Sequence, residues 1–291
     1  MKVVTPEEMA LIDRAAVQLE GIEGLDLMER AGAGVAYAAR DMLLAAGGRR
    51  VALCCGRGNN GGDGFVAARL LHRAGFEAEV FLVTGSREPA GDAKVNLERL
   101  AGLPVGMTEV SDEAGIEAFT SAPGGFDLVV DAIFGTGFSG EAGGLYAAAI
   151  EAVNASGLPV LAVDIPSGVS GATGAVAGPA VCACRTVTFA APKAGILLYP
   201  GAGLAGEFEV IDIGIPAGLL ESVPASRIEY VEQEDAAALL PVRAPDAHKG
   251  RCGNVLVVGG STGMTGAPAL CARAALRSGA GLVTAGVPAS L

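Results

Sequence analysis

Three groups of side chains that could do chemistry each follow an apolar run. They are residues 59–63 (Asn-Asn-Gly-Gly-Asp), Asp131, and the pair Asp164 and Ser167. Carboxylates can exchange protons with a ligand, and carboxylate, amide and hydroxyl oxygens suit a hard cation. If the runs are parallel strands, their carboxyl ends lie at one edge of a sheet and the groups converge there. The alternative is that each acid merely caps its own helix.

The first group lies in a glycine-rich stretch, residues 56–64. Gly56, Gly58 and Gly61 match the spacing of dinucleotide-binding loops, and Asp63 is expected to cap the helix that follows. That fingerprint also requires an acid at the end of the next strand, and the strand expected at residues 78–83 ends without one. A nicotinamide-dependent dehydrogenase is therefore disfavoured. A purely structural turn is the alternative to ligand binding.

Apolar strands alternate with helical stretches along the first 216 residues. This alternation requires crossover connections and predicts an α/β fold, a Rossmann-like αβα sandwich of three layers with a mostly parallel sheet. A helix is expected at about residues 25–46, and its small residues 31–34 suit close packing inside the fold or against a second subunit. The strands are expected at residues 51–55, 78–83, 127–133, 159–165, 185–190 and 207–213.

The composition limits the class of protein. The 291 residues are 51% hydrophobic and carry a net charge of −12, which argues against nucleic acid or an anionic membrane as a partner. No apolar run reaches the ~18 residues of a membrane-spanning helix, and Pro6-Glu-Glu8 does not fit a signal peptide. Cys54, Cys55 and Cys271 lie in apolar runs, as buried free thiols do, so we expect a cytoplasmic protein.

Five segments, taken in order, resemble the NAD(P)H-hydrate epimerase family. They are residues 59–63, 130–140 (Val-Asp-Ala-Ile-Phe-Gly-Thr-Gly-Phe-Ser-Gly), 163–168 (Val-Asp-Ile-Pro-Ser-Gly), 188–193 (Thr-Phe-Ala-Ala-Pro-Lys) and 212–216 (Asp-Ile-Gly-Ile-Pro). No single segment is decisive, but the ordered set is specific. The resemblance implies an isomerase that interconverts the R and S forms of hydrated NADH or NADPH. It also implies a bound potassium ion and, usually, a homodimer.

The resemblance assigns roles to individual residues. Potassium ligands fall on Asn60, Asp131 and Ser167, each an oxygen-bearing side chain at a different expected strand end. Substrate contacts fall on Asp164 and on two runs, the second of which offers backbone N–H groups to a phosphate. The runs are Asn59, Asn60, Gly61, Gly62 and Asp63, and then Gly135, Thr136, Gly137, Phe138, Ser139, Gly140 and Glu141.

The implied reaction suits a carboxylate. Hydrated NADH carries its hydroxyl on the ring carbon beside the ring nitrogen, so the nitrogen lone pair can help expel it as water. The planar iminium that results can take water back on either face. Asp164 is the catalytic candidate: it would donate the proton, deprotonate the returning water and stabilise the cation. Asp63 is the second candidate for the acid–base role. The alternative role for Asp164 is that of a helix N-cap. Lys193 is expected either to contact a phosphate or to be structural.

Residues 1–216 are the expected epimerase domain, and the alternation of apolar strands and helices ends there. Residues 217–245 predict a connector, and residues 246–291 predict a strand, a glycine-rich loop, a helix and a second strand. The last segment resembles the start of the ribokinase-like domain of ADP-dependent NAD(P)H-hydrate dehydratase, so the expected parent is bifunctional. About 45 residues are too few for an independent core. We therefore expect no lyase activity, and a tail that is poorly ordered or packed on the first domain.

The main alternative to an enzyme is a protein of the same fold that only binds a ligand or serves as a scaffold. A protein that had lost catalysis during evolution would be expected to have lost polar residues at the edge of the sheet as well. Asn60, Asp63, Asp131, Asp164 and Ser167 are all present, which favours the enzyme.

Overall fold

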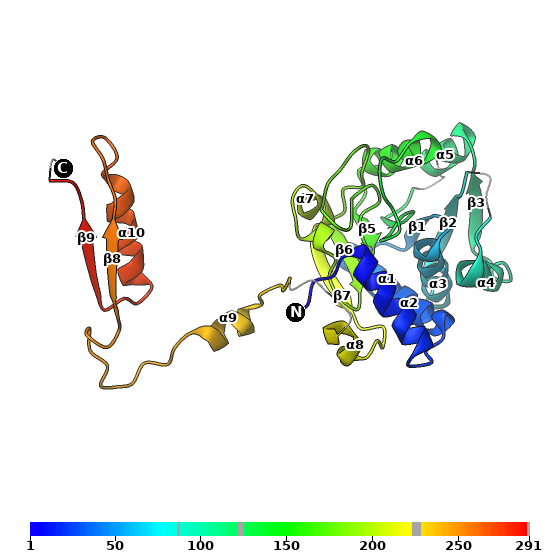
Figure 1. Ribbon diagram of the computed structural model, residues 1–291. Coiled ribbons are helices and arrows are strands. Elements are labelled where there is room, and N and C mark those ends of the chain that lie inside the picture. Colours follow the sequence, from blue (N-terminus) through cyan, green and yellow to red (C-terminus); the bar gives the residue numbers. More distant parts are fainter. Residues whose placement is uncertain (86–87, 122–124, 223–227, 290–291) are drawn as a thin grey trace. The chain divides into compact units, whose positions relative to one another are not determined.

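The computed structural model describes residues 1–85, 88–121, 125–222 and 228–289, in two compact units, Met1–Tyr230 and Val231–Leu291. The strands of the first unit are β1 (Arg50–Cys55), β2 (Glu77–Val83), β3 (Gly106–Val110), β4 (Leu128–Ala132), β5 (Val160–Val163), β6 (Arg185–Phe189) and β7 (Glu207–Ile211). They form one sheet in the order β3-β2-β1-β4-β5-β6-β7, and every neighbouring pair is parallel (Figure 1). The predicted α/β class with its parallel sheet is confirmed.

Helices cover both faces of the sheet. They are α1 (Pro6–Gln18), α2 (Gly24–Ala46), α3 (Asn59–Arg73), α4 (Gly91–Leu100), α5 (Glu113–Thr120), α6 (Gly144–Ala155), α7 (Gly201–Ala205) and α8 (Ala217–Ser222), with a 3-10 turn η1 (Ala194–Ile196). Alternate strand residues point to opposite faces, so Leu53 of β1 belongs to one core and Cys54 to the other. The first core lies under α1–α4 and α8, and the second under α5 and α6 (Figure 1).

The sequence predicted six of these strands and missed β3. This strand reads Gly-Met-Thr-Glu-Val at the edge of the sheet, and most of its residues are exposed or half-buried. An exposed edge strand does not need the continuous apolar run by which the buried strands were found. Its polar composition is the physical reason for the miss.

The glycine-rich stretch after β1 corrects a second prediction. Helix α3 begins at Asn59 with Gly58 as its N-cap, so Asp63 is buried within the helix and does not cap it. A Cβ at Gly56 would lie 2.1 Å from the carbonyl oxygen of Ile133, and a Cβ at Gly61 1.8 Å from that of Gly56. These glycines are therefore required because backbone packs directly on backbone, so the helix can begin immediately after the strand.

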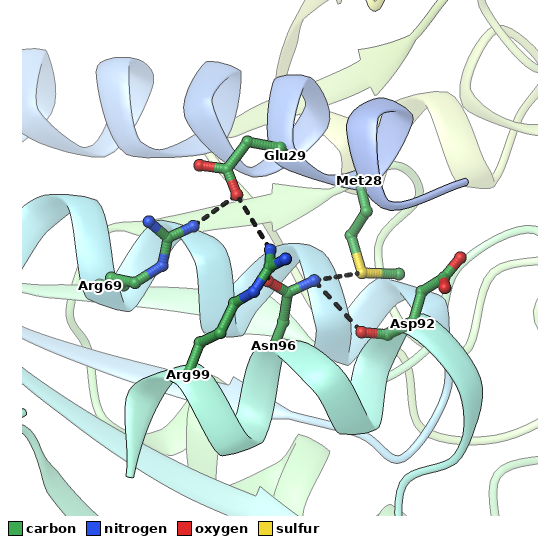
Figure 2. Close-up of polar contacts among 6 residues, drawn as sticks. All are labelled: Met28, Glu29, Arg69, Asp92, Asn96 and Arg99. Carbon is green, nitrogen blue, oxygen red and sulfur yellow. Dashed lines mark hydrogen bonds and ion pairs between the residues drawn. The ribbon is translucent and has the colours of Figure 1, made fainter. Parts of the chain in front are cut away.

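A polar network joins α2, α3 and α4 on the first face. Figure 2 shows Glu29 of α2 between Arg69 of α3 and Arg99 of α4, with an ion pair to each. Asn96 of α4 donates its amide to the sulfur of Met28 in α2 at 3.1 Å. Because Arg69 and Asn96 are both buried, the network lies within the helix contact and fixes α3, whose first turn reaches the edge of the sheet.

The small residues 31–34 of α2 pack inside the fold. A Cβ added to Gly32 would lie 2.4 Å from Val66 of α3, and one added to Gly34 would lie 2.8 Å from Ile211 of β7. Of the two uses that the sequence allowed for this patch, the structure shows the internal one. The patch therefore gives no reason to expect a second subunit.

The second unit contains α9 (Gln233–Leu239), β8 (Asn254–Val258), α10 (Gly266–Arg277) and β9 (Leu282–Gly286), with β8 and β9 paired in parallel. The strand, helix and strand expected there are present, although Cys271 is exposed and not buried as expected.

The first unit extends past Pro216, because Lys2 pairs with Glu229 in an antiparallel bridge. The ribokinase-like assignment, the domain limits and the order of the tail stay predictions. No described helix is long and apolar enough to cross a bilayer.

The contact at Gly32 predicts a stability defect. Gly32→Ala should lower the free energy of unfolding by about 1–3 kcal/mol, because the added methyl group collides with Val66 and overpacks the interface between α2 and α3. Gly218→Ala is the matched control, since Gly218 lies in α8 with open space around it. Thermal or urea unfolding measures both. Equal stability of the two variants would contradict this account of the packing.

Candidate active site

Asp131 is fully buried at the end of β4 and is bound to Ser167 from the loop after β5. Its Oδ1 accepts the Ser167 hydroxyl at 2.6 Å, and its Oδ2 accepts the Ser167 backbone N–H at 2.8 Å. The N–H of Phe134 donates to Ser167 Oγ at 2.9 Å, which links the loops after β4 and β5. Burial raises the pKa of Asp131 to about 6, against the lowering effect of the hydrogen bonds from Ser167.

Asn60 lies in the first turn of α3, beside Gly135 and Asp164. Its Oδ1 is 2.9 Å from the position that a Cβ of Gly135 would take, and Asp164 Oδ2 is 3.1 Å from the same position. Its amide nitrogen is buried and has no hydrogen-bond partner among the described residues. Because an amide's oxygen and nitrogen are assigned from their hydrogen bonds, the exchanged orientation would place a carbonyl oxygen there, a ligand suited to a hard cation.

Asp164 stands directly after β5 with its backbone in the left-handed region, at a φ of 67°. This conformation is uncommon for a residue with a side chain, although Asp tolerates it better than most. The Asp164 Oδ1 atom accepts the Thr188 hydroxyl at 3.1 Å, and Oδ2 accepts the backbone N–H of Thr136 at 3.1 Å. The carboxyl group is thus oriented by the loop after β4 and by the end of strand β6, so it does not serve as the N-cap that was the alternative.

Lys193 completes this arrangement from the loop after β6. Its ammonium group is 2.7 Å from Asp164 Oδ1 and also donates to the Thr188 hydroxyl at 3.1 Å and the Phe189 carbonyl at 2.9 Å. Both charges are buried, with side-chain exposures of 1% for Lys193 and 9% for Asp164. These contacts give Lys193 a structural role, and Lys193 also lines the cavity, so its contact with a phosphate stays a prediction.

The carboxyl groups of Asp63 and Asp13 lie near Asp164 and Lys193. Burial raises the pKa of Asp63 well above its usual range, the charges of Asp164 and Asp13 add to this effect, and Lys193 opposes it. Burial also raises the pKa of Asp13, on α1, to about 6, with Lys193 lowering it and Asp164 raising it. The sequence gave no indication of Asp13, because a single acid on an amphipathic helix is usually a solvated residue.

A cavity of about 830 Å³ lies at this edge, which is within the size range of small-molecule sites. Among its other lining residues are Phe134 and Tyr146, whose rings lie 4.8 Å apart, and the side chains of Arg14 and Arg57. None of these four was singled out from the sequence. Of the predicted substrate contacts, Asn59, Asn60, Asp63, Gly135, Thr136, Gly137, Phe138, Ser139 and Asp164 line the cavity, whereas Gly61, Gly62, Gly140 and Glu141 do not.

The fold and the cavity define a class of protein. A parallel sheet with a polar cavity at the carboxyl ends of its strands is the arrangement of Rossmann-like α/β proteins that bind small molecules. The model of the family described as "YjeF-related protein N-terminus" matches residues 24–195, and the chain belongs to that family. The matched residues include the segments after β1, β4, β5 and β6 that form the cavity.

Similar proteins extend the comparison beyond the family model. The chain is 47% identical over 283 residues to the bifunctional NAD(P)H-hydrate repair enzyme Nnr of Thermofilum pendens, covering 97% of this chain and 52% of that one. It is 44% identical to the protein of the same name from Moorella thermoacetica, with 99% and 54% covered. The chain therefore spans about half the length of these relatives. The crystal structure of yeast ynu0 is 25% identical with a TM-score of 0.65, covering 81% of this chain and 98% of that one.

The buried pair of Asp164 and Lys193 predicts a large stability effect. Lys193→Met should lower the free energy of unfolding by about 3–5 kcal/mol, because it leaves the Asp164 carboxylate buried without its partner. The double variant Lys193→Met with Asp164→Asn removes both charges and should recover a substantial part of that loss. Urea unfolding of the two variants measures the difference. Equal losses in both would contradict this account, because removing the Asp164 charge would then not relieve the loss caused by Lys193→Met.

Proposed function

We propose that this chain catalyses the epimerisation of the R and S forms of hydrated NADH or NADPH. The observation that carries the proposal is the Asp164 carboxyl group, held in the cavity by Lys193, Thr188 and Thr136. The names of the relatives support the substrate class, since they describe enzymes that repair NAD(P)H hydrates. The proposal concerns the first unit only. The relatives are named as bifunctional enzymes, and their second activity is not proposed for this chain.

The geometry suits a reaction that passes through a ring cation. Loss of the hydroxyl as water gives a planar iminium, and a carboxylate beside the ring lowers the energy of this charged intermediate. The Asp164 charge is fixed by its ion pair and two hydrogen bonds, so little reorganisation is needed as the cation forms. Return of water on the other face inverts the carbon and completes the epimerisation.

Chromatographic separation of the R and S hydrates tests the proposal. The parent chain should bring an unequal mixture to equilibrium faster than the slow spontaneous exchange does. Asp164→Asn should slow this approach by roughly 100- to 10,000-fold while substrate binding is largely kept, because the variant removes charge and proton exchange but little volume. The exposed Asp41→Asn on α2 is the control and should behave like the parent.

Two results would count against this proposal. A parent chain that binds the hydrates but leaves their ratio unchanged would support the alternative of a protein that only binds its ligand. A loss under about fivefold in a folded Asp164→Asn variant would assign the proton chemistry to another carboxyl group, since a general acid–base residue contributes at least about 100-fold.

We also propose that a potassium ion binds at Asn60, Asp131 and Ser167. Asp131 and Ser167 lie in direct contact, and Asn60 carries an amide oxygen beside the loop after β4, so the set offers hard oxygen ligands. The ion would supply positive charge next to the buried Asp131 carboxylate and steady the loops around it.

Activity measured against potassium chloride, with choline chloride keeping the ionic strength constant, tests this site. The parent should be faster with potassium, and Asp131→Ala should lose most of that response because a charged ligand is gone. Thermal unfolding without added potassium checks that the variant remains folded. The same potassium response in Asp131→Ala and in the parent would show that the ion binds elsewhere.

We further propose that the chain forms a homodimer through its N-terminal helices. Tyr37 and Leu44 of α2 are 61% and 62% exposed and lie seven residues apart, so they share one face of the helix. Sedimentation velocity at micromolar concentration should show a dimer, and Leu44→Glu should weaken it by placing a charge in the contact. A parent that sediments as a monomer would contradict the proposal.

A further inference from the structure

The proposed epimerisation has a requirement that one carboxyl group does not meet. The R and S hydrates carry their hydroxyl on opposite faces of the same ring carbon. A general acid or base must lie within hydrogen-bond reach of the oxygen whose proton it transfers. A group beside one face of a planar ring is therefore out of reach of the oxygen on the other face. Rapid epimerisation calls for a proton-transferring group on each side.

The cavity has a second carboxyl group on a different structural element. Asp164 is fixed at the edge of the sheet, after β5, whereas Asp13 projects from α1, which lies outside the sheet. Both residues line the same cavity. The two carboxyl groups therefore reach one cavity from different elements, which is what a ring with a proton-transferring group on each face requires.

We propose that Asp13 is a further catalytic residue, the acid–base group for the ring face opposite Asp164. The inference rests on the proposed epimerase function. Within the described part of the chain, no hydrogen bond or ion pair engages the Asp13 carboxyl group, in contrast to Asp164 with its three partners. Asp13 is also only half-buried, so its carboxyl group is available to a ligand and to solvent.

The electrostatic surroundings of Asp13 support this role. The charged and titratable groups that line the cavity with Asp13 are Arg14 beside it on α1, then Arg57, Asp63, Asp92, Asp164 and Lys193. Burial raises the Asp13 pKa to about 6, so the group can both give and take a proton near neutral pH. Asp63 is less suited, because burial raises its pKa well above the usual range and keeps its proton in place.

The proton and electron movements balance over the two faces. Asp13 in its acid form gives its proton to the hydroxyl on its face, the C–O bond breaks with its electron pair on oxygen, and water leaves. The ring nitrogen lone pair forms the C=N bond of the iminium. A second water then forms a C–O bond on the opposite face, the C=N pair returns to nitrogen, and Asp164 takes the proton. The reverse reaction exchanges the roles, and solvent resets the protons.

Exchange of the hydroxyl oxygen with isotopically labelled water tests this assignment. Each pure epimer is incubated with the full chain, and mass spectrometry after chromatography measures the label in both epimers. The parent should label both epimers as it interconverts them. Asp13→Asn should slow epimerisation by roughly 100- to 10,000-fold, yet the epimer whose hydroxyl faces Asp164 should still exchange its oxygen without inversion.

Control variants separate this role from a structural one. Glu7→Gln removes an exposed acid from the same helix and should leave both rates at the parental level. Asp13→Glu keeps the carboxyl group and should retain more epimerisation than Asp13→Asn. Unchanged epimerisation in Asp13→Asn would overturn the proposal and leave Asp164 serving both faces.

Two other results would also overturn it. If Asp13→Asn slows oxygen exchange of both epimers equally, Asp13 acts on a step common to both faces or on the structure of the cavity. If the parent chain itself neither epimerises nor exchanges oxygen above the spontaneous rate, the epimerase function fails, and the role of Asp13 fails with it. The activity of the parent therefore distinguishes the two failures.

Discussion

The buried ion pair between Asp164 and Lys193 is the interaction on which the rest of the site depends. Taking two charges out of water is costly unless the pair is close and its remaining hydrogen-bonding groups are satisfied. Here the hydroxyl of Thr188, the N–H of Thr136 and the carbonyl of Phe189 meet that condition. Thr136 lies in the loop after β4, and Asp164 follows β5. Thr188 and Phe189 are the last residues of β6, and Lys193 lies in the loop after it, so the pair joins the ends of these three strands.

The same pair positions the N-terminal helix. Val4 bridges to Lys193, its N–H bonding to the Pro192 carbonyl, and the Ala194 N–H bonds to the Val4 carbonyl. Helix α1 begins two residues later, at Pro6, with a capping box formed by Thr5 and Glu8. The segment that holds Lys193 against Asp164 therefore also fixes the start of α1, which brings Asp13 to the cavity. Loss of the ion pair would therefore disturb both the Asp164 carboxyl group after β5 and the Asp13 carboxyl group on α1.

Much of the fold could be predicted from the sequence because six of the strands in the first unit give clear apolar runs. The candidate site was harder, since side-chain partners depend on backbone geometry that no spacing shows. Asp63 resembled a helix cap because it follows a glycine-rich loop, yet these glycines lie inside α3 and let it pack closely against Gly56, Met28 and Cys55. Lys193 and Asp13 have ordinary sequence surroundings, and only the fold shows the first to be buried and the second to face the cavity.

The charges explain how three carboxyl groups share one cavity. Asp164 has the Lys193 ammonium group in contact, which stabilises the negative charge of its carboxylate. Asp13 and Asp63 have no ion pair among the residues that the structure describes, and burial, together with the charge of Asp164, favours their protonated forms. The cavity thus combines a carboxylate paired with a cation and two carboxyl groups whose pKa is raised by burial. A reaction that creates a ring cation and then adds water needs both features, because the charge stabilises the cation and the protons allow water to leave and return.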